Sequence, residues 1–208
     1  MYRPHSQAST ELLTKRLFLR LPLPGDGFAL YQALQASRKE LVPWIPWVER
    51  MSSPEQAEQG VQQAYVDFLQ KKAFHFHLFE QRSGTFVGSC GLHHINWDVP
   101  RMEMGYWIDS RFAGKGYMTE ATKALMSYAF FTHDTHRLEI RCDRNNNKSR
   151  AIPEKLGFML EATLLENERS PHTGELMDTC IYTAFHPSVS RPPESISEKQ
   201  NSALHYSN

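Results

Sequence analysis

The sequence predicts an α+β domain with one mixed, mostly antiparallel sheet of about seven strands. The first observation is the length of 208 residues, which fits one domain, because domains usually hold roughly 100–200 residues. The second is the central stretch 74–108, where apolar alternation and turn residues predict antiparallel hairpins. The third is the strand–helix–strand order of residues 102–142, which predicts a crossover connection.

The N-terminal part of the domain is predicted to hold one strand and two helices. Residues 17–21 form the strand, and a helix follows over about 28–37. Residues 41–48 contain two Trp and two Pro and cannot continue a helix, because proline lacks an N–H and clashes with the preceding turn. A second helix over about 53–72 begins with a Ser-Pro pair, an N-cap followed by proline at the first helical position.

The middle of the chain is predicted to be a hairpin and a further strand. Residues 74–79 alternate, residues 81–85 supply a turn, and the partner strand starts at Phe86. Residues 102–108 form the next strand, and Gly105 inside it predicts a bulge or a close backbone approach.

The C-terminal part is predicted to complete the sheet. The expected order is a glycine loop at 113–116, an apolar helix, a strand at 138–142, a short helix at 149–156, and strands at 160–165 and 180–185. Residues 11–186 therefore form the domain and residues 1–10 a polar arm. The tail, residues 187–208, is rich in Ser, Pro, Glu and Lys and is predicted to be disordered.

Composition excludes several classes of protein. Apolar residues make up 40% and charged residues 22% of the chain, which excludes a disordered or coiled-coil protein. The 23 basic and 23 acidic residues balance, so we expect no nucleic-acid partner, which would need a basic face. No apolar run is long enough to span a membrane. Three widely spaced cysteines predict free thiols and a cytoplasmic protein, and the oligomeric state stays open, a homodimer included.

A strand, a Gly-x-Gly loop and a helix follow one another from residue 102 and predict an anion site. The first N–H groups of a helix have no intrahelical partner, and the helix dipole is positive there, so a diphosphate fits. The simpler alternative is a loop that only turns the chain. Neither a P-loop nor a dinucleotide-binding G-x-G-x-x-G is present.

Three segments together resemble the GCN5-related N-acetyltransferases (GNAT), in particular the RimJ/RimL type, which acetylates N-termini of ribosomal proteins. They are Met104-Gly105-Tyr106-Trp107-Ile108, Phe112-Ala113-Gly114-Lys115-Gly116-Tyr117-Met118-Thr119-Glu120-Ala121 and Asn146-Asn147-Lys148-Ser149-Arg150-Ala151-Ile152-Pro153-Glu154-Lys155-Leu156-Gly157-Phe158. The resemblance covers about residues 10–186. It implies helices on both faces of the sheet and a parallel strand pair, 102–108 and 138–142, that splays apart.

The resemblance also implies an acetyl-coenzyme A site. The family's loop, [QR]-x-x-G-x-[GA], fits two frames, one starting at Arg111 and a preferred one starting at Ala113. The preferred frame departs from the pattern at Ala113 and Met118, but main-chain N–H groups should still hold the phosphates. The implied coenzyme contacts are the loop residues Ala113, Gly114, Lys115, Gly116, Tyr117, Met118 and Thr119, the main chain of Tyr106, Trp107 and Ile108, and the side chains of Asn146 or Asn147.

Three side chains are candidates for the chemistry. Glu168 matches a RimL-type glutamate that orders or deprotonates the amine, with a solvated loop carboxylate as the alternative. Glu103 is a second candidate base, or else it pairs with Arg101 or Arg141 on the far face of the sheet. Ser149 matches a hydroxyl that hydrogen-bonds the thiolate, and it could also cap the following helix. In many members of the superfamily a tyrosine protonates the sulfur, and Pro153 stands at that position in this chain.

Other conspicuous residues are given quieter roles. Trp44 and Trp47 either wall the acceptor cleft or pack their loop on the sheet. His75 and His77 share a strand face and His93 and His94 are adjacent, but no third ligand is spaced to complete a metal site, so we expect no metal.

The sequence therefore predicts an acetyl-coenzyme A-dependent N-acetyltransferase that works by direct transfer in a ternary complex. The expected acceptor is a protein N-terminal α-amine, by resemblance a ribosomal one. Two alternatives stay open. One is acetylation of a small amine such as a polyamine or an aminoglycoside, and the other is a sensor that binds acetyl-coenzyme A without turnover.

Overall fold

A computed structural model of the chain describes residues 9–170 and 173–188. Its single sheet has eight strands in the order β1-β2-β3-β4-β5-β6-β8-β7. The strands are β1 Glu11–Leu13, β2 Leu17–Arg20, β3 Phe74–Glu80, β4 Phe86–Asn96, β5 Arg101–Ile108, β6 Arg137–Asp143, β7 Met159–Arg169 and β8 Leu176–Phe185. Among the strands of the described residues, only β5 and β6 pair in parallel. The predicted mixed, mostly antiparallel sheet is confirmed, and β1 adds a short edge strand to the expected seven.

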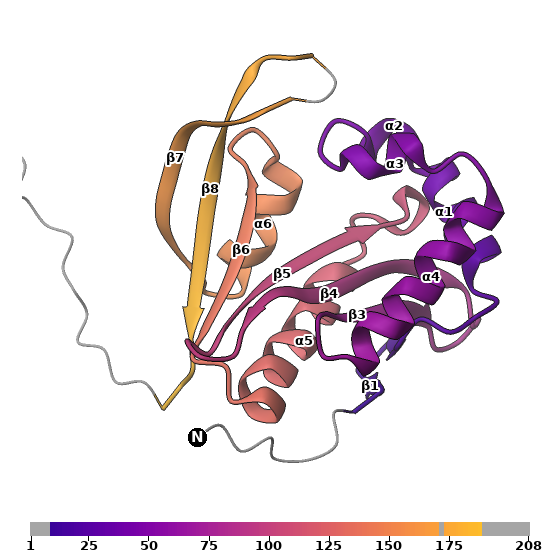
Figure 1. The fold of residues 1–208 in the computed structure, drawn as a ribbon, viewed down its shortest axis with the longest axis horizontal. Helices are drawn as coiled ribbons and strands as arrows, with labels where there is room; N and C mark the ends of the chain where they lie inside the picture. Colours follow the sequence, from indigo (N-terminus) through magenta and orange to yellow (C-terminus); the bar gives the residue numbers. More distant parts are fainter. Residues whose placement is uncertain (1–8, 171–172, 189–208) are drawn as a thin grey trace, which may run out of the picture.

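Helices cover both faces of the sheet (Figure 1). They are α1 Gly27–Ala36, α2 Arg38–Leu41, α3 Pro46–Arg50, α4 Pro54–Leu69, α5 Tyr117–His133 and α6 Asn147–Lys155, with one 3₁₀ turn at Ser110–Phe112. In Figure 1, α1 and α4 lie in front of the sheet and α5 lies behind it. Within the described residues, no helix combines the length and apolar character needed to cross a bilayer. Most of the tail predicted to be disordered lies outside the described residues.

Strand alternation divides the core between the two faces. On β5, Met102 and Met104 are buried in the cluster that α5 covers. Trp107, an odd number of residues further on, is buried in the cluster that α1 and α4 cover. Successive side chains of a strand point to opposite faces, so one strand supplies both halves of the core.

Two prolines mark where helices begin. At α4 the expected N-cap forms, since the Ser53 hydroxyl accepts a hydrogen bond from the Gln56 N–H at 3.3 Å. In the Trp-Pro segment, α2 ends at Leu41, as expected for a segment that cannot continue a helix, and a new helix, α3, starts at Pro46. Proline is tolerated at the first helical position, where its missing N–H would have no partner.

The parallel pair separates soon after it forms. The register joins residues 101–103 of β5 to residues 137–139 of β6 and then stops. Beyond that point β5 stays paired with β4 and β6 with β8, and the two strands diverge (Figure 1). The edge of β5 that faces β6 is therefore free of a strand partner from Met104 onward.

Candidate active site

A cavity of about 1030 Å³ lies where β5 and β6 diverge. Its walls come from the central strands, the α2–α3 region, α6 and β7. The sequence-predicted residues that line it are Trp44, Trp47, Glu103, Tyr106, Trp107, Ile108, Ala113, Met118, Asn146, Ser149 and Glu168. Those that do not are Gly114, Lys115, Gly116, Tyr117, Thr119 and Asn147. The structure thus brings the candidate catalytic side chains to one cavity, with the glycine loop, residues 113–116, at its edge.

The glycine loop presents main-chain donors. Gly114 and Gly116 have φ of 76° and 78°, a left-handed conformation that favours glycine, and α5 begins directly afterwards at Tyr117. Within the described part of the chain, the N–H groups from Gly114 to Thr119 have no hydrogen-bond partner. A left-handed residue followed by a helical one turns successive N–H groups toward the same side, which suits an anion. The helix dipole adds to this attraction.

Arg111, the first residue of the other loop frame, forms an ion pair with Asp109. Its Nε lies 3.0 Å from both carboxylate oxygens of Asp109, whose side chain is fully buried. This geometry favours the frame that starts at Ala113. Met118, where the family pattern has Gly or Ala, is buried against the core, so its side chain points inward while its N–H stays free.

Ser149 and Tyr106 meet across the divergence of the strands. The Tyr106 hydroxyl donates to the Ser149 carbonyl at 2.9 Å, and the Ser149 hydroxyl lies 3.5 Å from the Tyr106 oxygen. The alternative role of Ser149 as a helix cap is wrong. Asn146 is the N-cap of α6, and its side-chain oxygen accepts from the Ser149 N–H at 3.1 Å.

The Tyr106 hydroxyl is a site group that the sequence analysis missed. The family motif involves the main chain of Tyr106, and the position of the family's tyrosine that protonates the sulfur is occupied by Pro153. Strand alternation could have placed Tyr106 on the same face as Met102 and Met104, although not beside Ser149. Burial raises the pKa of Tyr106 above its ordinary value, so the phenol keeps its proton at neutral pH.

Glu103 lies opposite His93 on β4 and is contacted by the next residue, His94. The His94 Nδ1 is 3.0 Å from a Glu103 oxygen and 3.2 Å from the His93 Nδ1. A register shift follows His93, and His94 has φ 47°, so the bulge turns its ring toward Glu103. The alternative ion pair with Arg101 or Arg141 is wrong, because Arg101 lies 3.8 Å from Glu139 and no ion pair joins Glu103 to Arg141 in the described residues.

The His93–His94–Glu103 group also corrects the metal analysis. The sequence offered no third ligand beside the two histidines, yet the structure places one ligand atom of each residue within 4.8 Å of the others. Both contacts use the His94 Nδ1, so one N–H at that atom is shared between the Glu103 carboxylate and the His93 ring nitrogen. Absence of a metal stays a prediction.

Glu168 and the two tryptophans lie at the other end of the cavity. Glu168 is exposed on β7 opposite Met177, and within the described residues its carboxylate has no hydrogen-bond or ion-pair partner. Trp44 and Trp47 are 39% and 40% exposed and line the cavity, which fits the expected cleft wall better than packing of their loop on the sheet.

The comparisons with known proteins agree with this geometry. A family model described as an acetyltransferase (GNAT) domain matches residues 16–159. The [ribosomal protein uS5]-alanine N-acetyltransferase of Escherichia coli (strain K12) is 29% identical over 154 residues, which cover 72% of this chain and 78% of the relative.

Two solved structures show the fold. One is RimL, a ribosomal L7/L12 α-N-protein acetyltransferase in complex with coenzyme A, with 24% identity and a TM-score of 0.78, covering 84% of this chain and 96% of that one. The other is the microcin C7 self-immunity acetyltransferase MccE in complex with acetyl-CoA and AMP. It has 22% identity and a TM-score of 0.75, covering 82% and 93% of the two chains.

Proposed function

The chain belongs to the acetyltransferase (GNAT) family, and on that premise we propose that it transfers acetyl from acetyl-coenzyme A to the N-terminal α-amine of a protein. A ribosomal protein is the favoured acceptor, because the relative from Escherichia coli is named for one. The enzyme would then act in the cytoplasm, where ribosomal proteins are made.

The observation that carries the proposal is the run of unpartnered N–H groups from Gly114 to Thr119 beside the cavity. A diphosphate would satisfy these donors. The free edge of β5 from Met104 onward offers main-chain groups to the amides of the pantetheine arm. Coenzyme A contains both a diphosphate and a pantetheine arm, and the arm is attached to the diphosphate.

Direct transfer needs a neutral amine. A free α-amino group has a pKa of roughly 8, so a base helps moderately at neutral pH. The nitrogen attacks the thioester carbonyl, the C–N bond forms, the C–S bond breaks, and the amine proton goes to the base. We assign the base to Glu168, whose carboxylate lines the cavity without a partner in the described chain. A main-chain N–H on the open edge of β5 would stabilise the oxyanion.

Glu103 is the second candidate base. Its carboxylate also lines the cavity, and the contact with His94 gives a proton a route toward solvent, because the His94 side chain is 76% exposed. Replacing Glu168 and Glu103 separately by Gln distinguishes the two assignments, since Gln keeps the shape and removes the basic oxygen.

The leaving thiolate requires a hydrogen-bond donor or a proton. Ser149 and Tyr106 lie together at the divergence of β5 and β6, and the Ser149 hydroxyl can donate to the sulfur. The Tyr106 hydroxyl can also donate to the sulfur if its proton turns away from the Ser149 carbonyl, which accepts it in the free protein. We propose that this pair takes the place of the tyrosine that Pro153 replaces.

Cys142 also lines the cavity and is the alternative nucleophile for a covalent route. Burial raises its pKa to about 11, so at neutral pH it is a thiol rather than the nucleophilic thiolate. This supports direct attack by the amine over an acetyl-cysteine intermediate.

Acetylation of a small molecule is the second candidate function. The structure of MccE, which shares the fold, is described in complex with acetyl-CoA and AMP, and this supports a small-molecule acceptor as an alternative. A sensor that binds acetyl-coenzyme A without turnover is the third, and thiol release with any amine would discard it.

The test is intact-mass analysis after incubation of the pure enzyme with labelled acetyl-coenzyme A. The acceptors are ribosomal proteins, N-terminal peptides, and a panel of polyamines and aminoglycosides. We expect one added acetyl group on a protein N-terminus. Modification of a small amine alone would move the assignment to the second candidate, and modification of nothing, without thiol release, would favour the sensor.

A further inference from the structure

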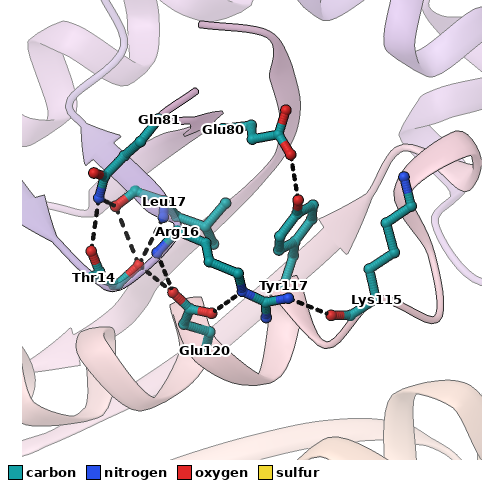
Figure 2. A network of polar contacts seen from close by, with 8 residues as sticks. All are labelled: Thr14, Arg16, Leu17, Glu80, Gln81, Lys115, Tyr117 and Glu120. Carbon is teal, nitrogen blue, oxygen red and sulfur yellow. Dashed lines mark hydrogen bonds and ion pairs between the residues drawn. The ribbon is translucent and has the colours of Figure 1, made fainter. Parts of the chain in front are cut away.

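Arg16 contacts the glycine loop although it is far from that loop in the sequence. It lies between β1 and β2, and its Nη1 donates to the Lys115 carbonyl at 2.8 Å (Figure 2). Its guanidinium carbon sits 4.5 Å from the centre of the Tyr117 ring. The N-terminal hairpin therefore packs directly against the start of α5.

The hydrogen bond to Lys115 constrains the next N–H group. A trans peptide is planar, and its C=O and N–H point in opposite directions. When Arg16 holds the Lys115 carbonyl on one side, the Gly116 N–H must point to the other side. A charged donor on the carbonyl also polarises the peptide and makes that N–H a better donor.

We propose that Arg16 is a positioning residue for the coenzyme, acting through the Lys115–Gly116 peptide to aim the N–H groups of the loop at the diphosphate. The inference rests on the proposed function, which supplies the diphosphate.

Arg16 is itself held in place from several sides (Figure 2). One Glu120 oxygen accepts from the Arg16 Nε at 2.7 Å, and the other accepts from the Arg16 backbone N–H at 2.8 Å and from the Thr14 hydroxyl at 2.7 Å. The Gln81 backbone N–H donates to the Arg16 carbonyl at 2.9 Å. Neither the main chain nor the guanidinium of Arg16 is free to turn away from the loop.

The carboxylate of Glu120 is well matched to this task. Burial alone would raise its pKa, but hydrogen bonds from Thr14 and Arg16 outweigh burial and lower the pKa below its ordinary value. Glu120 is therefore ionised at neutral pH. It lies in the first turn of α5, where a negative charge is favourable, and Arg16 offsets that charge beside a site meant for phosphates.

Tyr117 provides the surface on which the guanidinium rests. Its ring is buried, and its hydroxyl donates to Glu80 at the end of β3 (Figure 2). Arginine suits this place better than lysine would. One flat guanidinium donates from Nε to Glu120 and from Nη1 to the Lys115 carbonyl while stacking on an aromatic ring.

The experiment compares Arg16→Gln and Arg16→Lys with a matched control, Arg20→Gln. Arg20 also pairs with a carboxylate, Asp26 at 2.6 Å, and also lies over a ring, Phe79 at 4.4 Å, but it does not contact the loop. Calorimetric titrations measure the Kd of coenzyme A and of 3′-dephospho-coenzyme A, which keeps the diphosphate. Thermal unfolding without ligand measures stability, and kcat is taken at saturating acetyl-coenzyme A.

We expect Arg16→Gln to raise the Kd of both ligands by the same factor, roughly tenfold to thirtyfold, the usual range for losing a charged hydrogen bond. Arg16→Lys should not restore binding, and kcat should stay within about twofold of wild type. Arg20→Gln should lower the unfolding temperature and leave both Kd values unchanged.

Three results would overturn the proposal. Unchanged Kd values for Arg16→Gln would make Arg16 merely structural. Near-complete rescue by Arg16→Lys, or a larger loss for coenzyme A than for its dephospho form, would mean direct charge contact with the ligand. A wild-type protein that binds neither ligand would remove the proposed function together with this inference, whereas the first two results leave that function intact.

Discussion

Under the proposed function, the coenzyme and the acceptor are recognised by different means. The proposed coenzyme end lies at the edge of the cavity and consists of main-chain N–H groups within one short segment, residues 114–119. The acceptor end consists of side chains that come from the α2–α3 region, β4, β5 and β7. Backbone recognition depends on glycine conformation and on where a helix begins, both of which are local. Side-chain recognition depends on strand register and on packing over long distances in the sequence.

The same contrast appears in the charged groups. At the coenzyme end, Glu120 and Glu80 have pKa values held below their ordinary range, Glu120 by hydrogen bonds that outweigh burial and Glu80 chiefly by the Tyr117 hydroxyl. At the acceptor end, burial lowers the pKa of His75 and His93. The two carboxylates of the coenzyme end are therefore held charged, and these two histidines of the acceptor end are held neutral.

The largest expected effect is a change in the free energy of unfolding with pH, which tests the neutral histidines of the acceptor end. Burial chiefly, with the nearby His93, lowers the pKa of His75 from 6.5 to about 4. Between these values the unfolded chain binds more protons, so the free energy of unfolding is highest above 6.5 and falls as the pH drops toward 4. The contribution of His75 is up to about 3 kcal/mol.

Denaturant unfolding between about pH 7 and pH 4 measures this slope. The variant His75→Gln should flatten it, while other buried histidines keep part of it. An identical slope in wild type and variant would show that His75 is not held neutral in the fold.

The next effect concerns the coenzyme end alone. Gly116→Val places a β-branched residue at φ 78°, a conformation that costs about 1–2 kcal/mol for such a side chain, beside the approaching phosphates. We expect the Kd of coenzyme A to rise by about 100-fold or more. The control is Gly84→Val. Gly84 also has a left-handed backbone, with φ 67°, and a Cβ placed there would have no atom within 4 Å. Equal Kd values for the two variants would mean that the loop frame is wrong.

The next prediction concerns kcat and the proposed base, Glu168, at the acceptor end. Glu168→Gln should lower kcat by about 100-fold, the usual scale for a general base, with the Kd of coenzyme A little changed. Steady-state kinetics and calorimetry on the same preparation separate the two quantities. If Glu103→Gln has the larger effect, the base is Glu103, and if neither variant changes kcat, solvent takes the proton.

The smallest effect lies between the two ends. Ser149→Ala and Tyr106→Phe should each lower kcat by about tenfold, because each removes one donor to the thiolate. The double variant should lose less than the product of the two, since the hydroxyls contact each other. An absorbance assay of thiol release measures kcat of the three variants. If the double variant loses the full product of the two single factors, the two hydroxyls act on different atoms.

The strand, glycine loop and helix of the proposed coenzyme end were predicted well from the sequence because their determinants are local. The strand at 102–108, the glycine loop and the start of α5 all lie within one short stretch. The N-terminal hairpin was missed because β1 is an edge strand of three residues with little alternation to detect, and with it the role of Arg16 was missed.

The acceptor end was predicted only in part. The candidates Glu103, Glu168, Trp44 and Trp47 all reach the cavity. The partner of Glu103 was wrong, because a register shift in β4 and the left-handed backbone of His94 turn that ring inward, and neither feature follows from residue type alone. The Tyr106–Ser149 contact joins β5 to α6 across a break in the sheet, which only the tertiary structure reveals.

Amide hydrogen exchange with and without coenzyme A tests the central claim most directly. The account predicts that saturating ligand slows exchange of the N–H groups from Gly114 to Thr119, which have no partner in the described chain without it. Exchange at unchanged rates in this segment, with calorimetry reporting full occupancy, would place the diphosphate elsewhere and contradict the account.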